Sequence, residues 1–382
     1  MSYKLILTTI ALLIIISPIL PIVFLNAQQN QETYPEGLYI GVTADGNATA
    51  TKTLIDKVES FTNFLIINNP DLIRDQKSLE EVCGYAKKSG LRFFVHMKHP
   101  SFWQYNYNPL VWIENAQDEY RENFLGIYLF DEPGGNQLDK GDFRQFDETS
   151  KPSSYLDAAN TYIYYLYLQM RDFIKTENIV TSDYGLFWFD YEAGYDAIFT
   201  EFGSNRVTEI NIASCRGAAE MHNKSWGAII TWSYDEPPYI ASPDKVYQDM
   251  VTAYNAGAKY ISVFNYPETG PYGLLTQEYF EVMEQFKTYV FNNPQNKTSN
   301  NKKIAYVLPS NYGWGMRNPT DKIWGVWEAD DKSPAIWSDL TGLIEQYCYD
   351  FDIVVDSLWL RFFAGQHYDT LIFWSGEVQE LG

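Results

Sequence analysis

From Gly37 onward, short apolar runs rich in β-branched residues alternate with stretches of helical periodicity. This alternation is typical of repeated βα units that build a parallel sheet. Most of the runs lack strict polar–apolar alternation, as expected for strands that are buried on both faces. Eight runs qualify as strands, the number at which a parallel sheet closes into a (β/α)8 TIM barrel. The predicted strands are Leu38–Thr43, Phe64–Asn68, Leu91–Met97, Leu125–Asp131, Gly185–Asp190, Ala197–Glu201, Ala228–Ser233 and Tyr260–Asn265.

Three of the intervening helices have their own sequence signals. Ser242, Pro243 and Asp244 read as an N-cap, a first-turn proline and an acid that complements the helix dipole. This helix is predicted to run to about Gly257, a plausible C-cap. The other two are predicted over Tyr155–Lys175 and Thr276–Val290, and the latter has an apolar stripe at helical spacing formed by Tyr279, Val282, Met283 and Phe286.

The chain has 382 residues, which exceeds the roughly 250 that such a barrel needs. The barrel, with the catalytic function, is predicted over residues 36–290, and residues 291–303 read as a polar linker. Residues 304–382 are predicted to form a flavodoxin-like α/β module that is either small or truncated. Its expected elements are the strands Ile304–Leu308, Asp352–Asp356 and Thr370–Trp374 and the helix Ala335–Tyr347.

The N-terminus, residues 1–27, reads as a signal peptide or a membrane anchor. Residues Leu5–Leu25 are almost purely apolar and follow Lys4. A membrane-spanning helix needs ~20 apolar residues, whereas the apolar region of a secretory signal has roughly 7–15. The large Leu25 makes the possible cleavage site before or at Ala27 mediocre, so both alternatives stay open. Either one places the rest of the chain outside the cytoplasm, secreted or anchored to the membrane.

Charge and cysteine spacing exclude several classes of function. The chain has 49 acidic and 28 basic residues, and its net charge of −21 repels phosphate backbones, so we expect no nucleic-acid partner. Three widely spaced cysteines give neither a disulfide framework nor a zinc site. His96 and His99 are three apart on a predicted strand and therefore point to opposite faces. We expect no metal and no cofactor.

Acids and aromatic residues gather after the predicted strands. In this architecture the active site lies at the carboxyl ends of the strands, on the βα loops. Tyr and Trp combine a flat apolar face with a polar tip, which suits the C–H faces and hydroxyl edges of sugar rings. The side chains predicted to bind sugar by stacking or by hydrogen bonds to hydroxyls are Trp103, Trp188, Trp232, Tyr234, Asp131 and Asp190.

A repeated tripeptide marks the fourth and seventh strand ends. Asp131-Glu132-Pro133 follows one strand and Asp235-Glu236-Pro237 the other. A proline disfavours helical backbone in the residue before it, so we expect an extended glutamate whose carboxylate points into the barrel mouth. Glycoside hydrolysis needs two carboxyl groups that flank the scissile bond. The alternative is that Asp-Glu-Pro is merely a common strand-ending loop.

Residues 36–290 resemble the large clan of barrel glycosidases with an acid/base glutamate after strand four, usually in Asn-Glu-Pro, and a nucleophilic glutamate after strand seven. The resemblance implies that Glu132 is the acid/base, although Asp131 replaces the usual asparagine. Thr200-Glu201-Phe202-Gly203 is similar to the clan's nucleophile motif but follows the sixth predicted strand, so Glu201 and Glu236 both stay candidates. A different barrel clan uses an Asp nucleophile after strand four and an acid after strand six, which Asp131 and Glu201 would match.

The second module resembles the α/β domain that follows the barrel in some β-galactosidase-like enzymes, where it helps subunits associate. The segments with this resemblance are Lys303–Pro309 and Tyr312–Gly315. It implies a possible homo-oligomer. The sequence thus predicts an extracytoplasmic glycoside hydrolase acting on carbohydrate, with a retaining or an inverting mechanism. The alternatives are an inactive barrel that binds glycans and a structural protein of the cell envelope.

Overall fold

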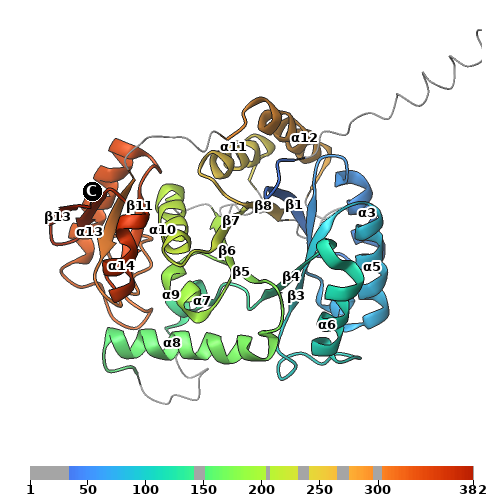
Figure 1. The fold of residues 1–382 in the computed structure, drawn as a ribbon, viewed down its shortest axis with the longest axis horizontal. Helices are drawn as coiled ribbons and strands as arrows, with labels where there is room; N and C mark the ends of the chain where they lie inside the picture. Colours follow the sequence, from blue (N-terminus) through green and yellow to red (C-terminus); the bar gives the residue numbers. More distant parts are fainter. Residues whose placement is uncertain are drawn as a thin grey trace, which may run out of the picture. The chain divides into compact units, whose positions relative to one another are not determined.

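The computed structural model describes residues 34–141, 151–203, 207–230, 241–264, 275–295 and 303–381 (Figure 1). Residues from Gly37 onward belong to one compact unit. Within the described residues, eight parallel strands close into a barrel in the order β1 to β8, and a smaller mixed sheet of four strands follows. The predicted (β/α)8 barrel is therefore confirmed. Its strands are β1 (Tyr39–Ala44), β2 (Phe64–Ile67), β3 (Arg92–Met97), β4 (Phe124–Leu129), β5 (Ile179–Asp183), β6 (Ala197–Phe202), β7 (Ser225–Ile230) and β8 (Tyr260–Phe264).

Helices surround the barrel, as Figure 1 shows. The helix predicted to start after Ser242 does so, because the Ser242 side chain accepts a hydrogen bond from the Lys245 amide. The predicted helix from Tyr155 ends at Met170 and continues only as a short 3-10 turn. The helices of the barrel are α3 (Ala48–Val58), α4 (Pro70–Arg74), α5 (Gln76–Lys88), α6 (Pro109–Tyr120), α7 (Pro133–Lys140), α8 (Tyr155–Met170), α9 (Phe187–Ala193), α10 (Thr208–Met221), α11 (Pro243–Asn255) and α12 (Gln277–Asn292).

One predicted strand is wrong. The fifth strand is Ile179–Asp183, whereas the segment predicted for it, Gly185–Asp190, enters helix α9. A short apolar run such as Leu-Phe-Trp-Phe fits a buried helix as well as a strand, and periodicity alone does not separate them. The backbone at Leu186 is left-handed, with φ 56°, which ends the extended segment and starts the helix.

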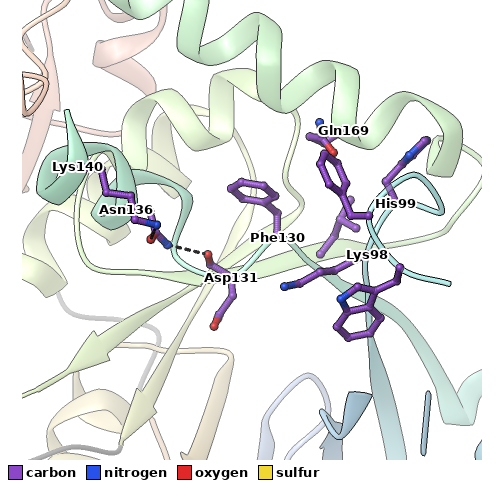
Figure 2. Close-up of a pocket in the computed structure, with 10 residues that line it drawn as sticks. Lys98, His99, Phe130, Asp131, Asn136, Lys140 and Gln169 are labelled. Atoms are coloured by element: carbon purple, nitrogen blue, oxygen red, sulfur yellow. Dashed lines mark hydrogen bonds between the residues drawn. The ribbon is translucent and has the colours of Figure 1, made fainter. Parts of the chain in front are cut away.

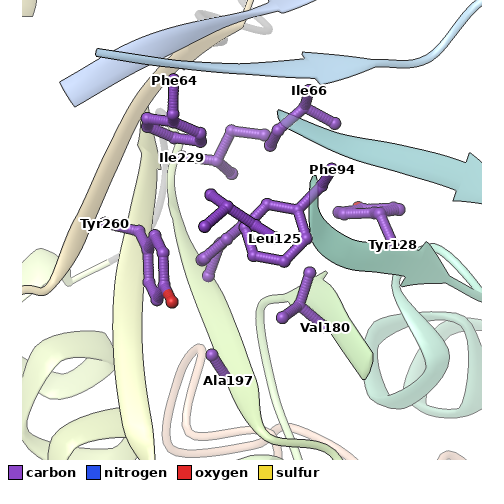
Figure 3. Close-up of a cluster of buried hydrophobic side chains, with 10 residues drawn as sticks. Phe64, Ile66, Phe94, Leu125, Tyr128, Val180, Ala197, Ile229 and Tyr260 are labelled. Carbon is purple, nitrogen blue, oxygen red and sulfur yellow. The ribbon is translucent and has the colours of Figure 1, made fainter. Parts of the chain in front are cut away.

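The barrel interior is filled by large side chains that point inward from every second residue of the strands. Figure 3 shows this cluster, in which rings from β2, β3, β6 and β8 pack against aliphatic residues. Glycines make room for the rings: a Cβ on Gly227 would lie 2.4 Å from the Phe199 ring, well inside contact distance. The cluster comprises Phe64, Ile66, Phe94, Leu125, Tyr128, Val180, Ala197, Phe199, Ile229 and Tyr260.

The small sheet has the order β11-β10-β12-β13, with β13 antiparallel to β12 and the others parallel. Strands β10, β11 and β12 and helix α13 lie where the sequence predicts them. The borders proposed for the linker stay a prediction, since residues 296–302 lie outside the described part of the chain. The elements are β10 (Ile304–Leu308), α13 (Ser333–Tyr347), β11 (Asp352–Val355), α14 (Leu358–Phe363), β12 (Thr370–Phe373) and β13 (Val378–Glu380).

Helix α10 joins the barrel to the small sheet through a buried ion pair. Arg216 donates from Nε to Asp352 Oδ1 at 2.7 Å, and from Nη2 to the carbonyls of Tyr349 and Phe351 at 2.6 and 2.9 Å. Asp352 also accepts from the Tyr368 hydroxyl at 3.0 Å. Gly217 allows the close approach, because a Cβ there would lie 2.6 Å from the Ile353 carbonyl.

The predicted signal peptide or anchor, residues 1–27, lies outside the described residues, and so the export of the chain stays a prediction. No helix in the described ranges has the length and apolar character needed to cross a bilayer.

We expect Arg216→Ala to lower the free energy of unfolding by about 3–5 kcal/mol, since it leaves Asp352 charged and buried without its partner. Urea denaturation would measure this loss. Arg361→Ala is the matched control: its ion pair with Asp356 is exposed and should be worth no more than about 1 kcal/mol. Equal losses in both variants would contradict the role assigned to Arg216.

Candidate active site

A pocket of about 90 Å³ opens at the carboxyl ends of the barrel strands; we call it the inner pocket. Among the residues that the structure describes, three acids line it: Asp131 and Glu132 after β4 and Glu201 near the end of β6. Glu201 lies 69 residues after Glu132 along the chain, and barrel closure brings it to the adjacent pair Asp131 and Glu132. The other lining residues are Thr43, Ile66, Asn68, Tyr128, Ser182, Ile229 and Phe264.

Two hydroxyls tie these acids into one network. Ser182 Oγ lies 2.9 Å from Glu201 Oε1 and 3.3 Å from Asp131 Oδ1. The two carboxylate oxygens therefore lie at most 6.2 Å apart, since neither can be farther from the other than the path through Ser182 Oγ. The Tyr128 hydroxyl donates to Asp131 Oδ1 and accepts from the Ser182 amide at 3.1 Å. When Tyr128 donates to Asp131 and Ser182 donates to Glu201, each carboxyl group accepts one hydrogen bond from a hydroxyl group.

The turn after β4 differs from the expected extended conformation. Glu132 is left-handed, with φ 50° and ψ 52°, and it directly precedes Pro133, the first residue of α7. Contacts on both sides hold this strained backbone: the Glu132 amide donates to the Ser182 carbonyl at 3.1 Å, and the Asn136 side chain donates to the Glu132 carbonyl at 2.7 Å. Tertiary hydrogen bonds therefore override the local effect of the proline.

Asp183, the residue after Ser182, anchors the same turn from beneath. Its carboxylate accepts hydrogen bonds from the amides of Gly134 and Gly135, in the first turn of α7, and both groups are buried. A residue larger than glycine does not fit at position 135, because its Cβ would lie 2.0 Å from the Tyr184 ring. Burial raises the pKa of Asp183 to about 7, against the stabilising effect of these amides on the charged form.

A larger pocket of about 400 Å³, the outer pocket, adjoins the inner one, and Asp131 lines both. Figure 2 shows Asp131 between Lys98, which follows β3, and Asn136 and Lys140 on α7. Part of its wall is aromatic and apolar, and Trp103, predicted to bind sugar, lies in that part. The remaining lining residues are His99, Phe102, Leu129, Phe130 and Gln169.

His96 on β3 is a buried neutral group beside the two pockets. Its Nδ1 bonds Asn68 Oδ1, and its ring lies 5.1 Å from the Tyr128 ring and 5.4 Å from that of Trp103. Burial lowers the pKa of His96 to about 4, which leaves the imidazole uncharged at neutral pH. With Nδ1 donating to the Asn68 carbonyl oxygen, the buried Nε2 is an acceptor without a hydrogen-bond donor among the described residues.

Two predicted sugar-binding residues lie elsewhere. Asp190 is fully buried on α9, where it accepts from the Tyr162 hydroxyl at 2.5 Å. Trp188 is also buried on α9; its indole donates to Glu192 at 3.0 Å and packs on the His222 ring. Neither lines a described pocket, because α9 is a helix outside the barrel rather than the fifth strand. Three further candidates, Trp232, Tyr234 and Glu236, lie outside the described residues.

Sequence reasoning missed Tyr128, Ser182 and Asp183. The prediction of the fifth strand at Gly185–Asp190 leaves Ser182 and Asp183 in a connection, whereas they are the last two residues of β5. The β-branched run Ile179–Thr181 would have been the signal for it. In the part of the chain that the structure describes, no cluster of three or more His, Cys, Asp or Glu residues could hold a metal ion.

No protein-family model matches this sequence, and no curated protein matches it. Solved structures with glycosidase barrels are similar in fold. The α-L-fucosidase isoenzyme 2 of Paenibacillus thiaminolyticus aligns over 87% of this chain and 59% of its own length, with 11% identity and a TM-score of 0.50. The endo-β-1,4-mannanase of Thermotoga petrophila covers 71% of this chain and 82% of its own, with 9% identity and a TM-score of 0.43. The GH99 endo-α-mannosidase of Bacteroides thetaiotaomicron covers 66% and 81%, with 13% identity and a TM-score of 0.40. At such identities the likeness concerns the fold.

The raised pKa values of Asp183 and Asp190 indicate that the folded chain becomes less stable as pH rises. Burial raises the pKa of Asp183 to about 7 from an ordinary 3.8, and burial and the charge of Asp183 raise that of Asp190 well above its usual range. The folded chain thus holds protons that the unfolded chain releases. The stability that these protons provide is full below about pH 4 and is lost as pH rises through about 7.

We therefore expect Asp190→Asn to reduce the fall in melting temperature between about pH 5 and about pH 8, because one buried acid has become neutral. Thermal unfolding followed by circular dichroism at several pH values measures the difference. Asp118→Asn, which changes an exposed acid on α6, is the control and should leave the wild-type profile intact. Parallel profiles for Asp190→Asn and wild type would refute the assignment.

Proposed function

We propose that this chain is a glycoside hydrolase that cleaves its substrate with Asp131 and Glu201. The observation that carries the proposal is the Ser182 hydroxyl shared by the two carboxyl groups in the inner pocket. Asp131 Oδ1 and Glu201 Oε1 lie no more than 6.2 Å apart. For this pair of oxygens the bound is compatible with the separation of roughly 5–5.5 Å typical of retaining glycosidases and lies below the ~6.5–9.5 Å of inverting ones.

In the proposed reaction Asp131 is the nucleophile. Its Oδ1 accepts the hydrogen bond from the Tyr128 hydroxyl and lies 3.3 Å from Ser182 Oγ, which donates its own proton to Glu201. Its Oδ2 accepts no hydrogen bond from the described residues and is available for attack. Oδ2 forms a bond to the anomeric carbon as the bond to the leaving oxygen breaks, and Glu201 donates a proton to that oxygen. Glu201 then takes a proton from water, the water oxygen attacks the same carbon, and Asp131 leaves as a carboxylate.

Glu132 provides the second assignment for the same activity. It lines the inner pocket with Glu201, and the resemblance to the Asn-Glu-Pro clan gives it the acid/base role. Asp131 is preferred because the Ser182 hydroxyl lies between it and Glu201 and because it lines the outer pocket as well, where the bulk of a sugar ring fits. The fold likeness to mannanases and fucosidases is compatible with both assignments and decides neither.

A catalytically inactive glycan-binding barrel is the competing function. A binding site needs aromatic faces and polar groups, whereas it gains nothing from acids that repel each other across a shared hydroxyl. The close approach of Asp131 and Glu201 costs stability, and such a cost is typical of catalytic sites, so it favours hydrolysis over binding alone.

The roles of the acids predict different responses to the leaving group. Asp131→Asn should lose about 10³-fold or more in kcat on every aryl glycoside, because no covalent intermediate forms. Glu201→Gln should lose as much on substrates with poor leaving groups but far less on dinitrophenyl glycosides, whose phenol needs no proton. Steady-state kinetics on a panel of aryl glycosides of both anomers measures both effects.

Glu132→Gln is the comparison that separates the two assignments. With Asp131 as nucleophile, Glu132→Gln keeps activity within about ten-fold of wild type. If Glu132→Gln shows the leaving-group pattern and Asp131→Asn does not lose activity, Glu132 is the acid/base and the assignment to Asp131 is wrong. A wild-type chain that hydrolyses nothing on the panel and on polysaccharides would favour the binding function.

Ser182→Ala should lower kcat by about 10- to 100-fold with little change in KM, since a hydrogen bond to a charged group is worth roughly 1.5–3 kcal/mol. The hydroxyl orients the two carboxyl groups and does not itself hold substrate. Ser214→Ala is the matched control, because it removes a buried serine hydroxyl that bonds within α10. Full activity in Ser182→Ala would mean that the shared hydroxyl has no part in positioning the acids.

A further inference from the structure

The outer pocket is lined by two positively charged side chains, which is unexpected in so acidic a chain. The protein has a net charge of −21, yet Lys98 and Lys140 both line the same cavity of about 400 Å³. They come from different elements, Lys98 from the end of β3 and Lys140 from the last turn of α7, and Figure 2 shows Asp131 between them.

Neither lysine is neutralised by an acid among the described residues. Lys98 is half-buried, and its ammonium lies over the Trp103 ring at 5.2 Å rather than beside a carboxylate. Lys140 donates to the Asn136 side-chain oxygen at 2.7 Å. Other cations of the described chain do pair with acids, as Lys52 does with Glu81 and Lys175 with Glu114. For the half-buried Lys98 the absence of an acid partner is costly, and the cost is offset when an anion binds. Lys140 is exposed and adds a second positive charge at the edge of the pocket.

The rest of the pocket suits a sugar ring. Trp103 and Phe102 offer flat apolar faces, and Asn136 and Gln169 offer amides for hydroxyl groups. His99, which also lines the pocket, pairs with Asp172 at 2.7 Å and so contributes no free positive charge there. The fixed charges that face the cavity are thus the two lysines and the carboxylate of Asp131.

We propose that the outer pocket binds a sugar with an anionic substituent, a carboxylate as in a uronic acid or a sulfate ester, and that Lys98 and Lys140 hold this group. The proposal rests on the function proposed above and specifies its substrate class. Lys98 stands beside Trp103, so a ring stacked on the indole would place its substituent next to the ammonium. Asp131 disfavours an anion at the reacting carbon itself, and this repulsion orients the charged group toward the lysines.

The test is binding of the whole wild-type chain at low temperature to a glycan array with neutral, uronate-containing and sulfated oligosaccharides. We expect binding to one anionic class at least about ten-fold tighter than to the neutral glycans with the same backbone. This preference should weaken as NaCl rises from about 50 to about 500 mM, since salt screens a pairing of charges. The class that binds, uronate or sulfate, identifies the source of the anion.

The double substitution Lys98→Met and Lys140→Met keeps the stems of both side chains and removes both charges. It should abolish the preference for anionic glycans and leave affinity for neutral ones within about two-fold. Lys77→Met with Lys88→Met, two exposed lysines on α5, is the control with the same change in net charge and should bind as wild type does. Lys98→Arg retains the charge and should retain the preference.

The outcomes separate this inference from the proposed function. Equal binding of neutral and anionic glycans, binding of no glycan, or an equal loss for both classes in the double variant overturns the inference. Hydrolysis of an anionic glycan with wild-type kinetics in the double variant also overturns it, while the glycosidase activity stands. Lysine-dependent binding of an anionic glycan that the wild type never hydrolyses keeps the binding site and removes the catalytic proposal.

Discussion

The turn after β4 depends on the end of β5. The Ser182 carbonyl accepts a hydrogen bond from the Glu132 amide, and the Ser182 hydroxyl contacts Asp131 and Glu201. The Asp183 carboxylate accepts hydrogen bonds from the amides of Gly134 and Gly135 in the first turn of α7. One dipeptide thus fixes a strained left-handed backbone and the direction of the carboxylates. A buried carboxylate at a helix N-terminus interacts favourably with the helix dipole, which helps to offset its desolvation. The active-site geometry therefore follows from how β5 pairs with its neighbours.

This dependence explains what the sequence could and could not predict. Seven strands were found because buried parallel strands are runs of apolar residues, and the barrel closes whichever exact residues begin them. The fifth was misplaced because the run Leu186–Phe189 is as apolar as a strand, although Ile179–Thr181 is the richer in β-branched residues. The error displaced Trp188 and Asp190 into the site and hid Ser182 and Asp183. The orientations of the Asp131 side chain and the Glu132 backbone depend on tertiary hydrogen bonds, and these leave no trace in the pattern of apolar residues along the sequence.

Buried acids and unpaired lysines distribute the large negative charge unevenly. Asp183 and Asp190 lie behind the site, where burial raises the pKa of Asp183 to about 7 and that of Asp190 well above its usual range, so both carry less negative charge than exposed acids would. Asp131, Glu132 and Glu201 line the inner pocket, and Lys98 and Lys140 line the outer one. With the proposed function, such an arrangement would separate the position where bonds change from the position where a substituent is recognised. It also gives a reason for cations in a chain whose surface otherwise repels anions.

Fold likeness alone would not support a function, since (β/α)8 barrels serve many unrelated reactions. Residues from three strands, which no local constraint requires to meet, support the proposed glycosidase activity instead. Tyr128 from β4, Ser182 from β5 and Glu201 from β6 all have inward-pointing side chains in the top layer of the barrel, where a purely structural core would place aliphatic groups. Each polar side chain buried there costs free energy unless it is paired. Pairing them with one another and with Asp131 removes the cost of burial while keeping two carboxyl groups a few ångströms apart, which is the arrangement that hydrolysis of a glycosidic bond needs.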